Sequence, residues 1–336
     1  MRYLRNIGLV RAIKWVRRGI VPVYLGLFSV ALVACGGGGG SDGDRAGGAD
    51  GGGTETNTGI FVDSPVEGLR YVTDSQERQT DSDGQFNYRA GETVEFYVGD
   101  IVIGATTGAL ELSPIDLVPG ATSENHPTVT NIARFLQTID DDGNPSNGIR
   151  ITEVVADLAR GETINFNQSI ADFEEDGAVQ VLVAALTSAT PAGARSLVPA
   201  SDAQAHLRSS LLSLLEGIWV GSTEIEFLTE PYRGDRCEWS SEFSADAGGL
   251  VEGSEILTHA TGIGQLACAT STIASGEWER SGNEVTFRTI SSSNPWIGGR
   301  TQFTGVISNE GQEITIEESG GELGIEYSRR VVWRRQ

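Results

Sequence analysis

The strongest candidate for metal chemistry is a loop of oxygen-bearing side chains at residues 140–148, which reads Asp-Asp-Asp-Gly-Asn-Pro-Ser-Asn-Gly. A calcium loop wraps its cation with side chains at alternate positions, and this loop offers Asp140, Asp142, Asn144 and Ser146. Two positions depart from an EF-hand loop: Pro145 replaces its glycine and Ile151 its bidentate glutamate. An Asx turn between two helices explains the same residues without a metal. Calcium and a plain turn are therefore both open.

Motifs for hydrolysis or phosphate chemistry are missing from residues 60–336. This stretch contains no Gly-x-Ser-x-Gly elbow, His-Glu-x-x-His pair, phosphate loop or dinucleotide fingerprint. The three histidines lie in separate regions: His126 before a proline, His206 on the polar face of an expected helix, and His259 at a strand end. We predict that the protein is not an enzyme. With 46 acidic residues, a hydrolase with an unrecognised pair of carboxylates stays open as an alternative.

The chain has three cysteines, and their positions indicate two different roles. Cys237 and Cys268 form an even pair, which in an exported protein favours a disulfide. Cys35 follows a segment typical of an export signal, in which six Arg and Lys side chains and no acid precede an uncharged apolar run at residues 19–34. This run is shorter than the roughly 20 residues that span a bilayer. An uncleaved membrane anchor is the alternative.

Leu32-Val33-Ala34-Cys35 resembles the lipobox of bacterial lipoproteins. The resemblance implies cleavage before Cys35, acylation of that cysteine with palmitate-type chains, and anchoring to a membrane of the cell envelope. Two or three acyl chains bury enough CH₂ groups for stable anchoring. Gly36, in place of Asp, implies sorting to the outer membrane by resemblance to enterobacterial lipoproteins, on the periplasmic face or at the cell surface.

Residues 35–59 are expected to be a flexible tether, because they are rich in glycine and small polar residues and cannot bury apolar surface. Without residues 1–34, 18 of the 24 Lys and Arg residues remain against 46 acids, so the mature net charge is −28. Such a surface repels nucleic acid, which we exclude as a partner.

Residues 60–104 are predicted to form a β-sandwich-like module, because apolar residues alternate there and Asp83-Gly84 supplies a turn. The segments 64–68, Ser-Pro-Val-Glu-Gly, and 80–86, Thr-Asp-Ser-Asp-Gly-Gln-Phe, resemble the carboxypeptidase-regulatory or transthyretin-like repeat. That family implies a structural or adhesive module without catalysis. Its usual seven strands do not all fit this stretch.

Residues 105–215 are predicted to be a helical unit. Apolar residues at helical spacing indicate helices over 128–139, 151–160 and 178–186, the last of them buried on all sides. Thr152 is expected to cap the second helix, and Ser201 to Gln204 form a capping box before a fourth. The stretch from Ser64 to Leu215 is similar to uncharacterised proteobacterial lipoproteins, in which the segment at 131–149 recurs. This family brings no known activity.

Residues 216–336 are predicted to form an antiparallel β-barrel or sandwich. Nine strand-like runs follow one another at short spacing, at 218–227, 237–243, 250–257, 264–270, 276–280, 284–290, 301–308, 313–317 and 324–333. Closure into a barrel removes exposed edges. Gly217 and Trp219 at the start, with Arg330 and Arg334 near the end, resemble the lipocalin opening and closing residues. A barrel of that family implies an apolar ligand, whereas the alternative is a barrel filled by side chains.

The sequence thus predicts a mainly β, α+β multi-domain fold: signal peptide 1–34, tether 35–59, sandwich-like module 60–104, helical unit 105–215 and barrel 216–336. We expect a non-catalytic structural, adhesive or binding role at the membrane, with an envelope protein or glycan as partner. The first alternative is a carrier of a small apolar ligand. No cofactor other than calcium is expected.

Overall fold

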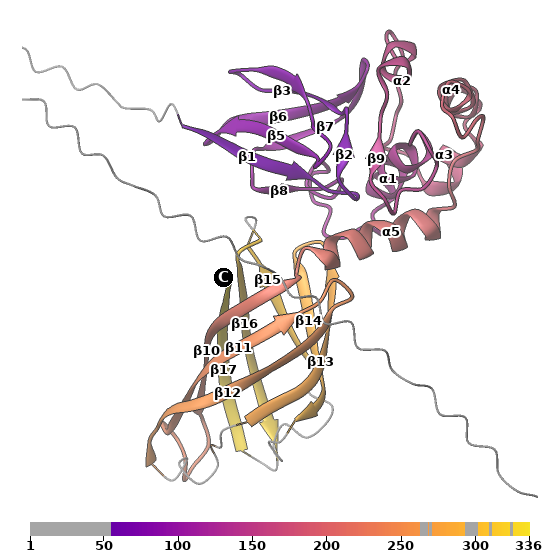
Figure 1. Cartoon of the computed structure of the whole chain (residues 1–336). Coiled ribbons are helices and arrows are strands. Elements are labelled where there is room, and N and C mark those ends of the chain that lie inside the picture. The colour runs from indigo at the N-terminus through magenta and orange to yellow at the C-terminus, as the bar shows by residue number, and fades with distance from the viewer. Residues whose placement is uncertain (1–54, 263–267, 269–270, 293–301, 309–310, 323–324) are drawn as a thin grey trace, which may run out of the picture. The chain divides into compact units, whose positions relative to one another are not determined.

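The computed structural model describes residues 55–262, 268, 271–292, 302–308, 311–322 and 325–336 (Figure 1). Cys35 and the predicted signal peptide lie outside this range. Among the described residues, no helix combines the length and the apolar character needed to cross a membrane.

Two small sheets begin the described chain. One has the strand order β5-β1-β8 and the other β4-β3-β6-β7, while β2 pairs with β9 in parallel. Aromatic rings from the two sheets meet in a shared core. The ring centroid of Phe96, on β6, lies 4.7 Å from that of Phe61 on β1 and 5.3 Å from that of Phe86 on β5. The strand bounds are β1 Thr56–Phe61, β2 Val66–Glu67, β3 Arg70–Val72, β4 Glu77–Gln79, β5 Gln85–Arg89, β6 Thr93–Val98, β7 Ile101–Thr107, β8 Glu111–Leu112 and β9 Ile149–Arg150.

Five helices follow or lie between these strands: α1 Pro127–Thr138, α2 Glu153–Leu158, α3 Ile170–Glu175, α4 Gly177–Ser188 and α5 Ala200–Ser213. Buried residues of both sheets, α1, α3 and α4 belong to one hydrophobic cluster. The sandwich-like module and the helical unit therefore share a core, and β7 and β8 extend past the expected boundary at residue 104. We call residues 56–213 the sheet–helix unit.

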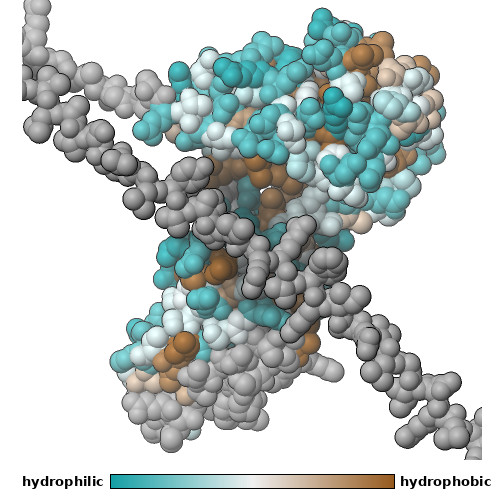
Figure 2. Space-filling model, in the orientation of Figure 1, coloured by the Kyte–Doolittle hydropathy of each residue, from teal (hydrophilic) through white to brown (hydrophobic). Residues whose placement is uncertain are grey.

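Two helix predictions need correction. Helix α4 buries one stripe of residues, including Val183 and Leu186, whereas Val181 is 72% exposed. Figure 2 shows apolar surface where α2 and α4 lie. Helix α5 begins at Ala200 after Pro199, so the box at 201–204 lies inside the helix and caps nothing. Thr152 does cap α2, because its hydroxyl accepts from the amide of Val155 at 3.3 Å.

The C-terminal strands close into one antiparallel barrel in the order β10 to β17, with β17 pairing back onto β10. Their bounds are β10 Gly217–Phe227, β11 Arg236–Ala245, β12 Leu250–Ala260, β13 Ser271–Ser281, β14 Glu284–Ser292, β15 Gln302–Ile307, β16 Glu313–Glu322 and β17 Ile325–Arg335. Eight of the nine expected runs are these strands, and the run at 264–270 falls almost wholly outside the described residues. The mainly β fold with a helical segment and a barrel is confirmed.

Candidate functional site

One end of the barrel interior is packed with aromatic side chains. Trp278 lies 5.7 Å from both Trp219 and Trp333 between ring centroids, and 6.0 Å from Phe287. Phe243 completes the group at 5.0 Å from Trp333. All five side chains are at most 3% exposed. The five rings come from five different strands, β10, β11, β13, β14 and β17. Each occupies an inward position, since side chains alternate along a strand, and together they fill one layer of the interior.

The next layer of the interior is polar. The Glu255 carboxylate accepts hydrogen bonds from Thr223 Oγ1 at 2.8 Å and from Ser241 Oγ at 3.2 Å. Arg329 lies 4.2 Å over the Phe303 ring and forms an ion pair with Glu318 at 3.3 Å. Burial raises the pKa of Glu318, and the charge of Arg329 opposes that shift. The barrel thus buries ionic groups together with their partners.

A cavity of about 20 Å³ lies between these layers. Three polar atoms at its lining residues have no hydrogen-bond partner within the described chain: Thr289 Oγ1, Arg329 Nε and Trp333 Nε1. A space of this size holds about one water, whereas pockets for small ligands measure roughly 300–1,000 Å³. In the described part of the barrel, the interior is therefore filled by side chains.

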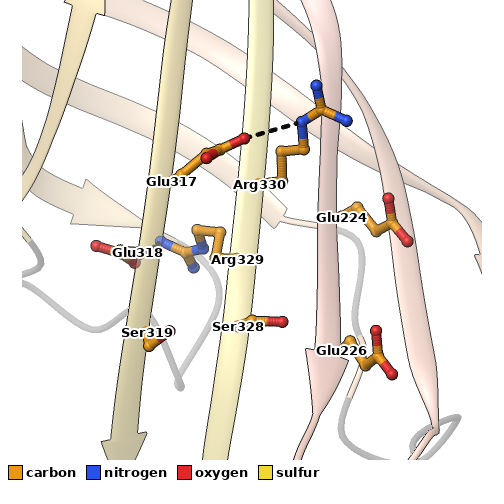
Figure 3. A pocket seen from close by; sticks show the side chains of 8 residues that line it. All are labelled: Glu224, Glu226, Glu317, Glu318, Ser319, Ser328, Arg329 and Arg330. Carbon is orange, nitrogen blue, oxygen red and sulfur yellow. Dashed lines mark ion pairs between the residues drawn. The ribbon is translucent and has the colours of Figure 1, made fainter.

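A hollow in the barrel wall at β10, β16 and β17 is charged rather than apolar (Figure 3). It measures about 440 Å³, and four of its eight lining residues are glutamates. Glu317 and Arg330 pair across it at 3.4 Å, and Glu224 stands beside them on β10. An apolar ligand finds no complementary wall here.

The lipocalin-like residues divide between the two faces of the barrel wall. Gly217 opens β10 with a φ of 137°, and Trp219 is fully buried, donating from Nε1 to the Leu215 carbonyl at 2.9 Å. Arg330 and Arg334 point outwards to glutamates on β16. Instead, Arg335 approaches the Trp219 ring, at 5.9 Å from its centroid. Because strand side chains alternate, Arg330 and Arg334 lie on the face of β17 opposite to Trp333, whereas Arg335 lies on the same face as Trp333.

The cysteine pair behaves as expected. Cys237 and Cys268 are bridged, with Cα atoms 6.2 Å apart, within the usual range for disulfides. Both are buried beside Trp239, and Leu257 packs against the group. The bridge ties the start of β11 to the segment that follows β12.

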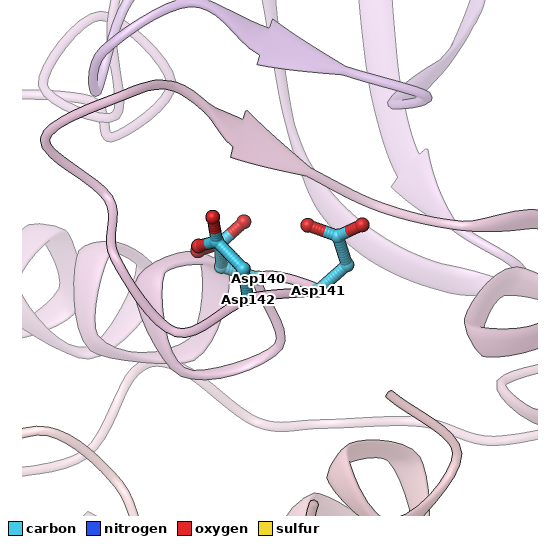
Figure 4. Close-up of side chains that lie close together, drawn as sticks. All are labelled: Asp140, Asp141 and Asp142. Atoms are coloured by element: carbon cyan, nitrogen blue, oxygen red, sulfur yellow. The ribbon is translucent and has the colours of Figure 1, made fainter. Parts of the chain in front are cut away.

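The aspartate loop gathers three neighbouring carboxylates rather than the four alternating side chains expected for calcium. One oxygen from each of Asp140, Asp141 and Asp142 lies within 4.8 Å of the others (Figure 4), whereas Asn144 and Ser146 are exposed. Ile151, at the glutamate position, is buried.

Hydrogen bonds within this loop already use the carboxylate oxygens. Asp140 accepts from the amides of Asn144 and Arg150, both at 2.9 Å, and Asp142 accepts from the Asn144 amide and the Asn147 side chain. Burial raises the pKa of Asp140, and the Asn147 contact leads the lowering of the pKa of Asp142. Arg195 Nη2 also donates to the Asp140 carbonyl. These contacts are those of Asx turns, and the Arg195 guanidinium supplies a positive charge nearby. Calcium binding therefore stays a prediction.

Sequence reasoning missed one polar cluster in the sheet–helix unit. Asp63 is fully buried, and its carboxylate accepts from Gln137 Nε2 at 2.9 and 3.1 Å. Burial raises the pKa of Asp63 to about 7. The adjacent Ser64 contacts His206, and burial lowers the pKa of that histidine. These residues are far apart in the chain. In the sequence, Asp63 and Ser64 stand between two expected strands and His206 stands on the polar face of an expected helix, and neither position is a distinctive signal.

Comparisons with known proteins give little. No family model matches the chain, and no curated protein matches it. Among solved structures, Rv2717c from M. tuberculosis is 14% identical over 38% of this chain and 95% of its own, with a TM-score of 0.20. A similarity at that level supports no argument about fold or function. The resemblances noted in the sequence therefore stay predictions.

Proposed function

We propose that the mature chain is a lipid-anchored envelope lipoprotein whose folded part has a non-catalytic binding or structural role. The anchor rests on the Leu-Val-Ala-Cys motif ending at Cys35. The first described strand begins at Thr56, so some 20 tether residues separate it from that cysteine. A glycine-rich coil of this length spans roughly 25 Å on average, which lets the folded part stand off from the bilayer.

The filled barrel interior is the observation that favours a structural role over carriage of an apolar ligand. Five aromatic rings occupy one layer, and the cavity beside them holds about one water. The outer wall carries cross-strand ion pairs such as Glu313–Arg334 at 2.7 Å and Glu317–Arg330 at 3.4 Å. A wall of this kind suits contact with water and polar partners, whereas lipid-facing strands carry an apolar band.

Native mass spectrometry of the mature chain, extracted in detergent, tests the binding part of this proposal. A barrel filled by its own side chains predicts the mass of the lipidated chain alone. Extra mass that survives a calcium chelator and leaves on denaturation would establish the carrier instead. Mass lost on chelation and absent from an Asp140→Asn, Asp142→Asn variant would place calcium in the aspartate loop.

Radiolabelled palmitate tests the anchor separately. We expect label in the wild-type chain and none in Cys35→Ala. The Cys237→Ala variant is the matched control, because it removes another cysteine and should retain the label. Equal labelling of the wild type and Cys35→Ala would refute lipidation at that position.

A further inference from the structure

Ser64 and His206 lie in hydrogen-bond contact although 142 residues separate them. Ser64 Oγ is 3.0 Å from His206 Nε2. The serine belongs to the turn between β1 and β2, and the histidine to α5. Both residues keep part of their surface exposed to solvent.

The direction of this hydrogen bond follows from the neighbouring groups. Ser210 Oγ donates to the His206 carbonyl at 3.1 Å and accepts from the Ser64 amide at 3.0 Å. Its proton is therefore used, although Ser210 Oγ also lies 3.5 Å from His206 Nε2. The Ser64 hydroxyl is left as the donor to Nε2.

The histidine is oriented from its other side. The backbone carbonyl of Asp63 lies near the imidazole and favours its charged form, which opposes the lowering of the His206 pKa by burial. Because Nε2 faces the Ser64 and Ser210 hydroxyls, Nδ1 is the nitrogen left to carry the proton of a neutral imidazole, and Nε2 can then accept from Ser64. A nucleophile, a base in contact with it and a third group that orients the base form the arrangement that activates a serine.

The backbone at Ser64 is strained. Its φ is 61°, and it is the one non-glycine residue with a positive φ among those described. Such outliers cost roughly 1–3 kcal/mol and gather at functional sites. Here the strained conformation accompanies the approach of the hydroxyl to His206.

We propose that Ser64 is an activated nucleophile that takes an acyl group from small activated esters. Ser64 Oγ forms a bond to the carbonyl carbon while its proton passes to His206 Nε2. The bond from that carbon to the leaving oxygen then breaks, and the leaving group takes the proton from His206. The products are an acylated Ser64 and an alcohol or phenol.

This reaction stops after one acyl group per chain. Hydrolases accelerate both half-reactions with donors aimed at the developing oxyanion, each worth roughly 10²–10³ in rate. The Ser64 amide cannot act as such a donor, because it is bonded to Ser210. Ser64 is thus a modification site, which goes beyond the proposed binding or structural role and does not depend on it.

p-Nitrophenyl acetate is the probe that tests the proposal on the full mature chain. We expect release of one p-nitrophenolate per chain and one added acetyl group, located on Ser64 by peptide mapping. Ser64→Gly should abolish this label, and glycine suits the positive φ, so the fold is retained. His206→Gln should slow it by about 100-fold or more, since general-base help contributes about 10²–10⁴.

Ser209→Ala is the matched control, because Ser209 is exposed on the same helix. It should react as the wild type does. Circular dichroism checks that all variants are folded. The proposal is overturned if Ser64 is acetylated no faster than Ser209, or if His206→Gln reacts at the wild-type rate. Acetylation of Ser64 that depends on His206 supports it whether or not the chain is lipidated.

Discussion

The sheet–helix unit and the barrel bury polar groups in different ways. On α1, three buried side chains donate to backbone carbonyls: Asn131 to Phe166 at 3.0 Å and Arg134 to Val198 at 2.7 Å, both in loops, and Gln137 to Ala203 in the first turn of α5 at 3.2 Å. In the barrel, the strand ladder already satisfies the backbone. Inside the barrel, the buried polar side chains Thr223, Ser241 and Glu255 bond to one another, whereas Arg280, at the end of β13, donates to the backbone carbonyls of Gly282 and Leu211.

This difference has an energetic consequence. The first unit depends on polar side chains that hold loops against a helix, because buried backbone groups need partners. The barrel depends on how well its rings fill the space that closure creates. The two can be followed separately, because all five tryptophans beyond residue 55 lie at positions 219–333. Tryptophan fluorescence reports on the barrel, and circular dichroism at the helical minimum reports on the first unit.

The largest effect is expected from Trp278→Ala. This residue is 2% exposed and contacts two other tryptophans, so its loss should cost roughly 3–5 kcal/mol of unfolding free energy. Urea unfolding followed by fluorescence should show the loss, with the helical signal unchanged. Val306→Ala on β15 is the control, since its side chain is 62% exposed, and should shift stability by less than about 0.5 kcal/mol. Equal effects of the two would contradict a barrel stabilised by its filling.

The second effect is a pH dependence confined to the sheet–helix unit. The pKa of Asp63 is about 7 in the fold against 3.8 ordinarily, so the folded state holds a proton that the unfolded chain releases. Its contribution to stability is full below about pH 4 and is lost as the pH rises through 7, by roughly 4 kcal/mol. Urea unfolding followed by circular dichroism at pH 4.5, 6 and 8 measures this decline.

Asp63→Asn should remove most of that decline, because an amide cannot ionise. Asp83→Asn, at an exposed turn position, is the matched control and should leave it unchanged. A wild-type stability that stays level from pH 4.5 to 8 would mean that Asp63 is hydrated in the fold.

The third effect comes from the disulfide. Cys237 and Cys268 are 31 residues apart, and opening such a loop costs roughly 2–4 kcal/mol. We expect reduction to lower the urea midpoint seen by fluorescence and to leave the helical midpoint in place. The Cys237→Ser, Cys268→Ser variant should match the reduced wild type and no longer respond to reductant. A loss of the helical signal on reduction would show that the two units unfold together.

The smallest effect concerns a helix cap. Thr152→Ala removes the hydroxyl that accepts from Val155, which should cost about 1 kcal/mol in the helical transition only. Thr163→Ala, an exposed loop position, serves as control. If both substitutions are neutral, α2 is held by its packing alone.

Periodicity made much of this fold predictable. Alternation of apolar residues located eight barrel strands, helical spacing located α1, α2, α4 and α5, and a capping threonine marked the start of α2, since these features act within a few residues. Cysteine number also predicted the Cys237–Cys268 bridge. The short helix α3, with Phe173 as its one buried residue, was missed because six residues carry too little periodic signal.

Only the tertiary structure decided which distant groups meet. Nothing local in the sequence relates Ser64 to His206, or Asp63 to Gln137, because each pair forms when a turn packs against helices more than 70 residues away. The approach of Arg335, rather than Arg330 or Arg334, to the Trp219 ring depended on which side chains of β17 face inwards when the barrel closes. The sequence by itself determined the elements and the candidate anchor, since local propensity and composition suffice for these. The filled barrel and the contact of Ser64 with His206 required the packed chain, because both depend on space shared by residues from separate elements.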